Sequence, residues 1–341
     1  MPLRRVWLHA IVAATLSLFA IHCHAAQPSV ERPAAGHPEV KLAPGVESIS
    51  LSPYLSHFHD KGAADSAASA WQRLERGDFK PVPGGKSAFG FQRGAFWFHA
   101  RLTNREAAEP RWMLVQRYAL SDHIDVYVRY PDGRVVHQAS GDYLPFDSRS
   151  IPYRHPNFLL ELPLDEPVDL LVRVESQSSM QVPLDLYTPA AFTSLSRDAQ
   201  FVMGVYYGIL LALFVYNLVL WLALRDASYF WYLFHISAFG LVLFTLNGFA
   251  FEYLWPDSPW LADRSVPLSI CLALIGMQQF ARTFLELPQR FAWGNRISLG
   301  LIAFFLALGI ASFWLPSSCR PDRFAHGADR RAVDRGGEPS S

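Results

Sequence analysis

Aromatic and arginine side chains alternate with apolar residues along three segments of the chain, a pattern that could form a binding face. These side chains are Trp97, His99, Arg101, Tyr127, Arg129 and Arg173. Aromatic rings stack on sugars, and guanidinium groups bind oxygen atoms in a bidentate way. We therefore expect a carbohydrate or an anion to bind there. The alternative is an ordinary solvent-exposed face without a ligand.

A second candidate site lies in residues 141–149, where turn-forming residues surround two charged side chains. Asp147 and Arg149 could line a pocket at the end of a loop. The alternative is a structural ion pair between them.

Catalytic and metal chemistry has little support in the sequence. A glycan hydrolase needs two carboxylates close together, and no spacing selects such a pair among the acids of residues 122–175, so we expect no enzyme. His57 and His59 would point the same way on a strand, which a metal could use, but a third ligand is not evident. We expect exposed histidines, no metal site and no cofactor.

The residues that would position these side chains form short segments with period-two alternation, which places one face in a core. The apolar faces are Phe96, Phe98, Ala100 and Leu102; Ile124, Val126, Val128 and Tyr130; Val168, Leu170, Val172 and Val174; and Val182, Leu184 and Leu186. Weaker strand candidates are residues 46–51, 112–116, 134–137 and 158–162, and residues 66–76 could form a short helix. Turn residues separate the segments. We predict a jelly-roll-like β-sandwich over residues 46–197.

Residues 200–315 hold only ten charged side chains and contain four apolar stretches long enough to cross a bilayer. The predicted spans of this helical bundle are 200–224, 229–251, 266–284 and 297–315. Basic residues in short loops mark the cytoplasmic side, and here they are Arg225, Arg282, Arg290 and Arg296. The acidic loop between the second and third spans would then lie outside, with the sandwich. Asn217, His235, Asn247, Gln278 and Gln279 lie inside the spans, and we expect them to form hydrogen bonds between helices.

Both ends of the chain differ from the rest. Arg4 and Arg5, an apolar run and the small residues Ala25 and Ala26 predict a signal peptide over residues 1–25. Residues 26–45 follow as a flexible leader. The tail, 316–341, has five Arg and no Leu, Ile, Met, Trp or Tyr. We expect it to be disordered or read out of frame, in a truncated protein.

Composition excludes several classes of protein. Net charge is zero, which argues against a nucleic-acid-binding protein. Hydrophobic residues make up 51% and charged residues 18%, which excludes an intrinsically disordered chain. The signal peptide and the basic loops place the N-terminal domain outside the membrane, where the expected partners are an extracytoplasmic small molecule or glycan. The lipid bilayer and a second copy of the chain are the other expected partners.

Several short segments, taken in their order along the chain, resemble the motifs of one protein family. They are residues 96–104, 122–127, 141–149 and 172–176, followed by 204–217, 224–232 and Gly248. Together they are similar to bacterial seven-transmembrane receptors with diverse intracellular signalling modules. The resemblance implies a jelly-roll sensor akin to carbohydrate-binding modules, seven spans, and a cytoplasmic histidine kinase or diguanylate cyclase.

The chain departs from this pattern, with four predicted spans and no kinase or cyclase motif after Leu315. We therefore expect a receptor or a truncated fragment of one. It would lie in the bacterial inner membrane with its N-terminal domain in the periplasm, and it could pair with an intact receptor. The alternatives are a membrane-anchored glycan-acting enzyme and a non-signalling membrane scaffold.

Overall fold

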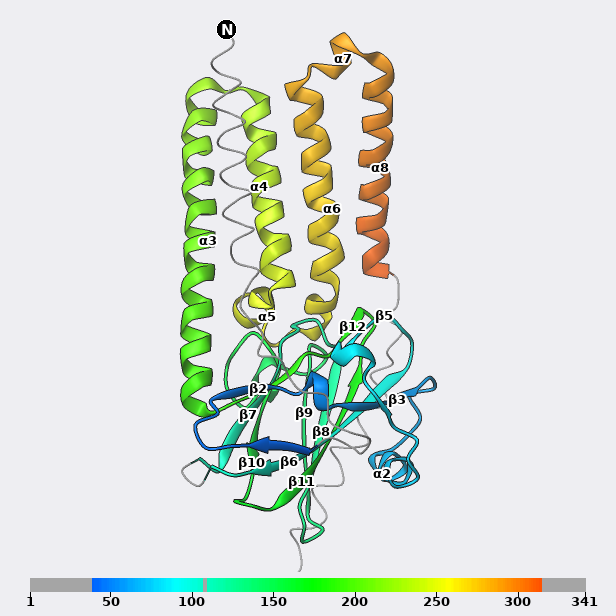
Figure 1. The fold of residues 1–341 in the computed structure, drawn as a ribbon. Helices are drawn as coiled ribbons and strands as arrows, with labels where there is room; N and C mark the ends of the chain where they lie inside the picture. Colours follow the sequence, from blue (N-terminus) through cyan, green and yellow to red (C-terminus); the bar gives the residue numbers. More distant parts are fainter. Residues whose placement is uncertain (1–38, 107–108, 315–341) are drawn as a thin grey trace, which may run out of the picture. The chain divides into compact units, whose positions relative to one another are not determined.

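The computed structural model describes residues 39–106 and 109–314 (Figure 1). The predicted signal peptide, residues 26–38 of the predicted leader and the predicted tail lie outside the described residues.

Two antiparallel sheets form the N-terminal domain. The larger sheet has the order β4 (Lys80–Pro81), β3 (Ser56–Asp60), β6 (Ala95–Asn104), β11 (Pro167–Glu175), β8 (His123–Arg129) and β9 (Val135–Ser140), with β1 (Glu39–Leu42) beside β6. The smaller sheet has the order β10 (Asn157–Glu161), β7 (Arg111–Gln116), β13 (Leu184–Tyr187) and β2 (Ser48–Ser50). A third pairing joins β12 (Ser179–Gln181) to β5 (Ala88–Phe91). Short 3₁₀ turns cover Ser52–Tyr54 (η2), Pro83–Gly85 (η3) and Phe146–Ser148 (η4).

One apolar core fills the space between the two sheets. Phe98 and Leu170 from the larger sheet and Trp112 and Phe158 from the smaller sheet are all almost fully buried in it. Alternation along each strand supplies these residues, because successive side chains point to opposite faces. The predicted sandwich fold is confirmed.

Strand β1 corrects the prediction of a flexible leader through residue 45. Glu39–Leu42 pairs in parallel with Arg101–Asn104, and Val40 and Leu42 are fully buried. A single short strand gives little local signal, and its partner lies about sixty residues away. Only the pairing with β6 determines its conformation.

Four described helices are long and apolar enough to cross a membrane: α3 (Pro189–Leu224), α4 (Ala227–Leu246), α6 (Pro259–Phe284) and α8 (Ala292–Trp314). Two short helices, α5 (Phe249–Tyr253) and α7 (Leu287–Arg290), connect them. The four long helices stand side by side, and α3 packs against α4, α4 against α6, and α6 against α8 (Figure 1).

Several element boundaries in the structure differ from those of the predicted segments. Helix α3 begins at Pro189 rather than at residue 200, because Thr188 caps it and Pro189 fits its first position. The sandwich therefore ends at Tyr187, not at residue 197. The second span ends at Leu246 rather than at residue 251, because Gly248 takes a left-handed conformation with φ of 81°.

Some of the polar residues inside the spans join helices, as predicted. The His235 ring is bonded to the Ala273 carbonyl across α4 and α6 at 2.9 Å, and Ser298 donates to Gln278 across α8 and α6 at 3.1 Å. Asn217 and Asn247 instead donate to carbonyls of their own helices.

Replacing Trp97 by alanine should destabilise the sandwich by about 3–5 kcal/mol, because it empties a fully buried site. The matched aromatic control is Phe91→Ala, since Phe91 is 81% exposed and its loss should change stability by less than about 0.5 kcal/mol. Thermal unfolding of the full chain in detergent, followed by near-UV circular dichroism, measures both. Equal melting temperatures for the two variants would contradict the assignment of Trp97 to a core.

Candidate functional site

Part of the outer face of the larger sheet, where the sequence predicts a binding surface, is covered. Helix α2 (Ala67–Glu75) covers it and forms a second apolar cluster with Trp71, Trp97 and Leu171. Trp97 is fully buried, so its ring offers no stacking surface. The helix starts at Ser66, whose side chain accepts a hydrogen bond from the Ser69 backbone.

Three of the predicted polar residues of this face bind the same carboxylate, that of Asp169. Asp169 accepts hydrogen bonds from His99 at 3.0 Å, from Arg101 at 3.1 and 3.3 Å, and from Arg129 at 3.3 Å. Arg129 also lies 4.1 Å from the centre of the Trp71 ring. The Arg101 side chain is 52% exposed, whereas His99 is buried.

A second group on the same face surrounds Asp125. His123, His137 and Arg173 lie 3.1, 2.9 and 3.5 Å from its carboxylate oxygens. Tyr127 stacks on His137 with ring centres 4.4 Å apart. Burial alone would raise the pKa of Asp125, but the two histidine hydrogen bonds and the Arg173 charge hold it well below its usual range.

The other two predicted residues, Asp147 and Arg149, do not form the ion pair considered above. Asp147 is exposed, whereas Arg149 is only 6% exposed and lies over the rings of Phe146 and Phe251. Burial lowers the pKa of Arg149 to about 10, against the opposing charges of Asp142 and Glu252.

Arg149 belongs to a segment that contacts two membrane helices, and we call residues 141–156 the β9–β10 loop. Its Tyr153 meets Phe192 of α3 with ring centres 5.3 Å apart, in a cluster with Met113 and Tyr187 of the smaller sheet. Helix α3 therefore begins on the sandwich itself, directly after strand β13. Asn157 fixes the loop through two hydrogen bonds of 2.8 Å with Ile151.

The β9–β10 loop also contacts α5. Phe146 meets Phe251 at 5.7 Å between ring centres, and the Arg154 guanidinium lies 5.1 Å from the Phe249 ring. Gly248, just before α5, has no room for a side chain. A Cβ there would lie 2.8 Å from the Ala119 Cβ and 2.9 Å from the Arg154 carbonyl. We call this contact region between the β9–β10 loop, α5 and the start of α6 the joint.

Charged groups at the joint are buried with few partners. Nε and Nη1 of both Arg149 and Arg154 have no hydrogen-bond partner among the described residues. Burial, with the charges of Arg154, Arg117 and Arg149, lowers the pKa of His155 to about 3. Burial also raises the pKa of Glu252. Burying polar and charged groups without hydrogen bonds costs free energy. These groups therefore lower the stability of the packed joint.

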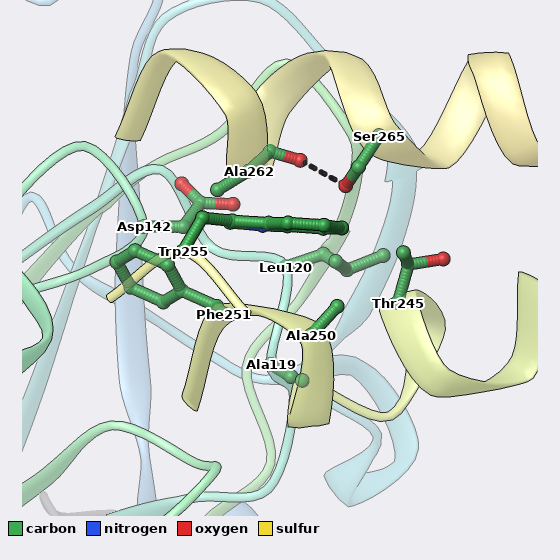
Figure 2. Close-up of a pocket in the computed structure, with 10 residues that line it drawn as sticks. Ala119, Leu120, Asp142, Thr245, Ala250, Phe251, Trp255, Ala262 and Ser265 are labelled. Atoms are coloured by element: carbon green, nitrogen blue, oxygen red, sulfur yellow. Dashed lines mark hydrogen bonds between the residues drawn. The ribbon is translucent and has the colours of Figure 1, made fainter. Parts of the chain in front are cut away.

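A small cavity lies at the centre of the joint. Its walls come from the sandwich at Ala119, Leu120 and Asp142, and from the helices at Thr245, Gly248, Ala250, Phe251, Trp255, Ala262 and Ser265. Figure 2 shows the Trp255 ring beside the Asp142 carboxyl. The cavity holds about 10 Å³, which is room for one water molecule.

Sequence reasoning missed most of the joint. Asp142, Arg154 and Trp255 come from loops whose spatial proximity no local pattern shows. One signal was present: Asn247-Gly248 is a strong turn dipeptide inside an otherwise apolar stretch.

Comparisons with known proteins agree with this two-part architecture. The model described as 7TMR-DISM extracellular 2 matches residues 52–188, and the model described as 7TM diverse intracellular signalling matches residues 199–321. The chain belongs to the 7TMR-DISM family. It is a membrane protein with an extracellular sensor domain and transmembrane helices, built from the domains of a membrane signalling receptor. The resemblance proposed from the sequence is therefore confirmed.

The first match ends where the structure joins the sandwich to α3, and the second begins at residue 199 within that helix. The extracellular domain of the family ends at residue 188, next to the first residue of the helix. No curated protein matches the chain. Among solved structures, it is similar to a Bacteroides fragilis protein described as a candidate β-galactosidase, with 13% identity and a TM-score of 0.27. That alignment covers 41% of this chain and 23% of the other.

Replacing Gly248 by alanine should loosen the joint, because it adds a steric clash to left-handed strain. We expect a cost of about 2–4 kcal/mol from the two effects together. The control is Gly133→Ala, since Gly133 has φ of 85° but open space around its Cβ, and strain alone should cost about 1–2 kcal/mol. Hydrogen–deuterium exchange of α5 in the full chain should rise only in Gly248→Ala. Unchanged exchange there would contradict the packing at Gly248.

Replacing Asp125 by asparagine should destabilise the sandwich at neutral pH by about 1–3 kcal/mol, because charge-assisted hydrogen bonds are lost. The folded-state pKa of Asp125 is lowered, so its carboxylate stabilises the fold above about pH 4 and loses this effect as the pH falls further. The difference between wild type and Asp125→Asn should therefore shrink in acid, as measured by denaturant unfolding. Asp132→Asn, in an exposed turn, is the control, and a pH-independent difference would contradict the assignment.

Proposed function

We propose that the chain is a receptor of a bacterial inner membrane, with its sandwich in the periplasm, that detects an extracytoplasmic ligand and transmits the signal through the joint. The observation that carries this proposal is the β9–β10 loop, which contacts both α3 and α5 with buried side chains. A movement of that loop must shift at least one of the helices, since packed interfaces do not deform freely.

The charges at the helix ends support this orientation. The acidic residues Glu252 and Asp257 belong to the α4–α6 connection that touches the sandwich, and Asp263 follows in the first turns of α6. Arg225 lies at the opposite end of α4, and Arg290 lies in the short α7 that follows α6. Basic connections favour the cytoplasmic side, which supports the proposed periplasmic position of the sandwich.

We place the ligand at the edge of α2 on the larger sheet, where the sequence predicted a binding face. Arg101 and Arg129 keep partly exposed guanidinium groups there and share the Asp169 carboxylate, and Arg129 also pairs with Glu75 of α2. A ligand carboxylate or a sugar hydroxyl is suited to the exposed sides of these groups. With Trp97 buried and Tyr127 covered by His137, recognition depends on charge more than on ring stacking. A carbohydrate that carries a carboxylate fits this chemistry best.

No catalytic step belongs to this proposal. Asp125 and Asp169 are each held by histidine and arginine side chains. A receptor needs only a ligand that binds two arrangements of the joint with different affinity.

The test is a thermal-shift titration of the full chain in lipid nanodiscs with a uronic-acid oligosaccharide and a neutral oligosaccharide of equal length. The acidic probe should stabilise the protein by about 2.7 kcal/mol at one hundred times its Kd, and Arg101→Ala should abolish the shift. Arg105→Ala is the matched control, because its side chain is 51% exposed, like Arg101, but binds Asp165 instead. No shift with wild type, or an equal shift in Arg101→Ala, would overturn the assigned site.

A further inference from the structure

Two acidic side chains of the sandwich, Asp122 and Asp142, are held together at the joint by the backbone. The Asp142 N–H donates to the Ser121 carbonyl at 3.0 Å, and the Tyr143 N–H donates to the Asp122 carbonyl at 3.1 Å. Between them Gly141 lies so close that a Cβ would be 2.3 Å from the Asp122 carbonyl oxygen. The backbones of the two residues therefore cannot separate unless the sandwich itself is distorted.

Asp142 points toward the membrane helices. It lines the cavity together with Trp255 and Phe251 and with Ala262 and Ser265 of α6 (Figure 2). Its Oδ1 is buried and accepts no hydrogen bond from the described residues. Asp122 is better satisfied, because Gln177 N–H and Ser176 Oγ donate to it at 2.8 and 3.2 Å.

The charges that face this pair are mostly negative. The sandwich contributes Glu175 and one basic group, Arg149, and α6 contributes Asp263. The neighbouring Arg264 lies 3.4 Å from Asp263. From α5, Glu252 faces Arg149 and Arg154. An ionised Asp122–Asp142 pair would thus add two negative charges to a buried acidic site whose nearby basic groups face other acids as well.

Burial is the main cause that raises the pKa of both groups. It raises the pKa of Asp142 well above the usual range, with the charges of Asp122 and Asp263 adding to the effect. It raises the pKa of Asp122 to about 7, even though two hydrogen bonds favour the ionised form. The closed joint therefore binds protons more tightly than an open, hydrated joint does.

We propose that Asp122 and Asp142 form a proton-operated switch that closes the joint when protonated and loosens it when ionised. This regulation rests on the proposed receptor function, since it acts on the contact that would carry the signal to α5 and α6. Because the closed state holds its protons more tightly than the open state, a fall in pH through the neutral range stabilises the closed arrangement, and a rise favours the open one.

The test measures hydrogen–deuterium exchange of residues 249–262 in the full chain in nanodiscs, at about pH 6 and about pH 8, with rates corrected for intrinsic exchange. Each pH unit changes the ionised-to-protonated ratio of an isolated carboxyl about tenfold. We therefore expect exchange to rise about three- to tenfold at the higher pH. Asp142→Asn should keep exchange low at both values, and Asp122→Asn should reduce the dependence. Asp132→Asn, in an exposed turn, should behave as wild type.

The sign of its response separates His155 from the pair, whereas Glu252, whose pKa burial also raises, is separated by the Asp122→Asn and Asp142→Asn variants. Burial lowers the pKa of His155, so its protonation loosens the fold as the pH falls, which is the opposite direction. Equal exchange at the two pH values in wild type, or a dependence that persists in both Asp122→Asn and Asp142→Asn, would overturn the switch. The experiment uses no ligand, so a failed oligosaccharide titration would remove the ligand site and leave the switch standing, whereas flat exchange would remove the switch alone.

Discussion

The packing of the β9–β10 loop against α3 and α5 is the interaction on which the two halves of this receptor depend. The covalent link between them is a single one, from β13 through Thr188 into α3, and one link alone would let the helix pivot. Tyr153 against Phe192 supports the first turns of α3, and Phe146 against Phe251 adds a contact at α5. Asn157 keeps the loop in one shape. In the proposed mechanism, this packing passes a change in the sandwich on to the helices, which a flexible linker would not do.

The outer face of the larger sheet carries a network of charged side chains beside the short helix α2. Each carboxylate there, Asp125 and Asp169, is surrounded by histidine and arginine donors, which repays the cost of removing it from water. Removing one partner from such a group costs more than the pair contributes to net stability. The network therefore stabilises the register of β6, β11 and β8. The guanidinium groups of Arg101 and Arg129, which α2 does not cover completely, remain partly exposed.

The joint is built differently from both the sandwich core and the sheet face. Its aromatic contacts enclose carboxyl and guanidinium groups that have few hydrogen-bond partners among the described residues, and this is the arrangement with the highest cost in a rigid core. Segments of low local stability are the ones that move in a signalling protein. The break at Asn247-Gly248 allows the chain to leave the span and reach the sandwich, and the close approach at Gly248 keeps both surfaces together. Buried charged groups with few hydrogen-bond partners and tight steric packing thus occur together at the contact where a receptor would change conformation.

The sequence alone determined the fold class, the strong strands, the four apolar spans and the family. Hydrophobic periodicity and the length of an apolar stretch are local properties, which can be recognised without knowing the spatial contacts of the segment. The sequence also predicted which side chains lie on the outer face of the sheet, but not which residues contact them there. Only tertiary structure decided that α2 buries Trp97, that β1 joins the sheet, and that Arg149 lies against Phe251 rather than Asp147. The same holds for the joint, where Asp122, Asp142 and Trp255 meet from separate loops. Their burial and charge depend on distances in space, which spacing along the chain does not encode.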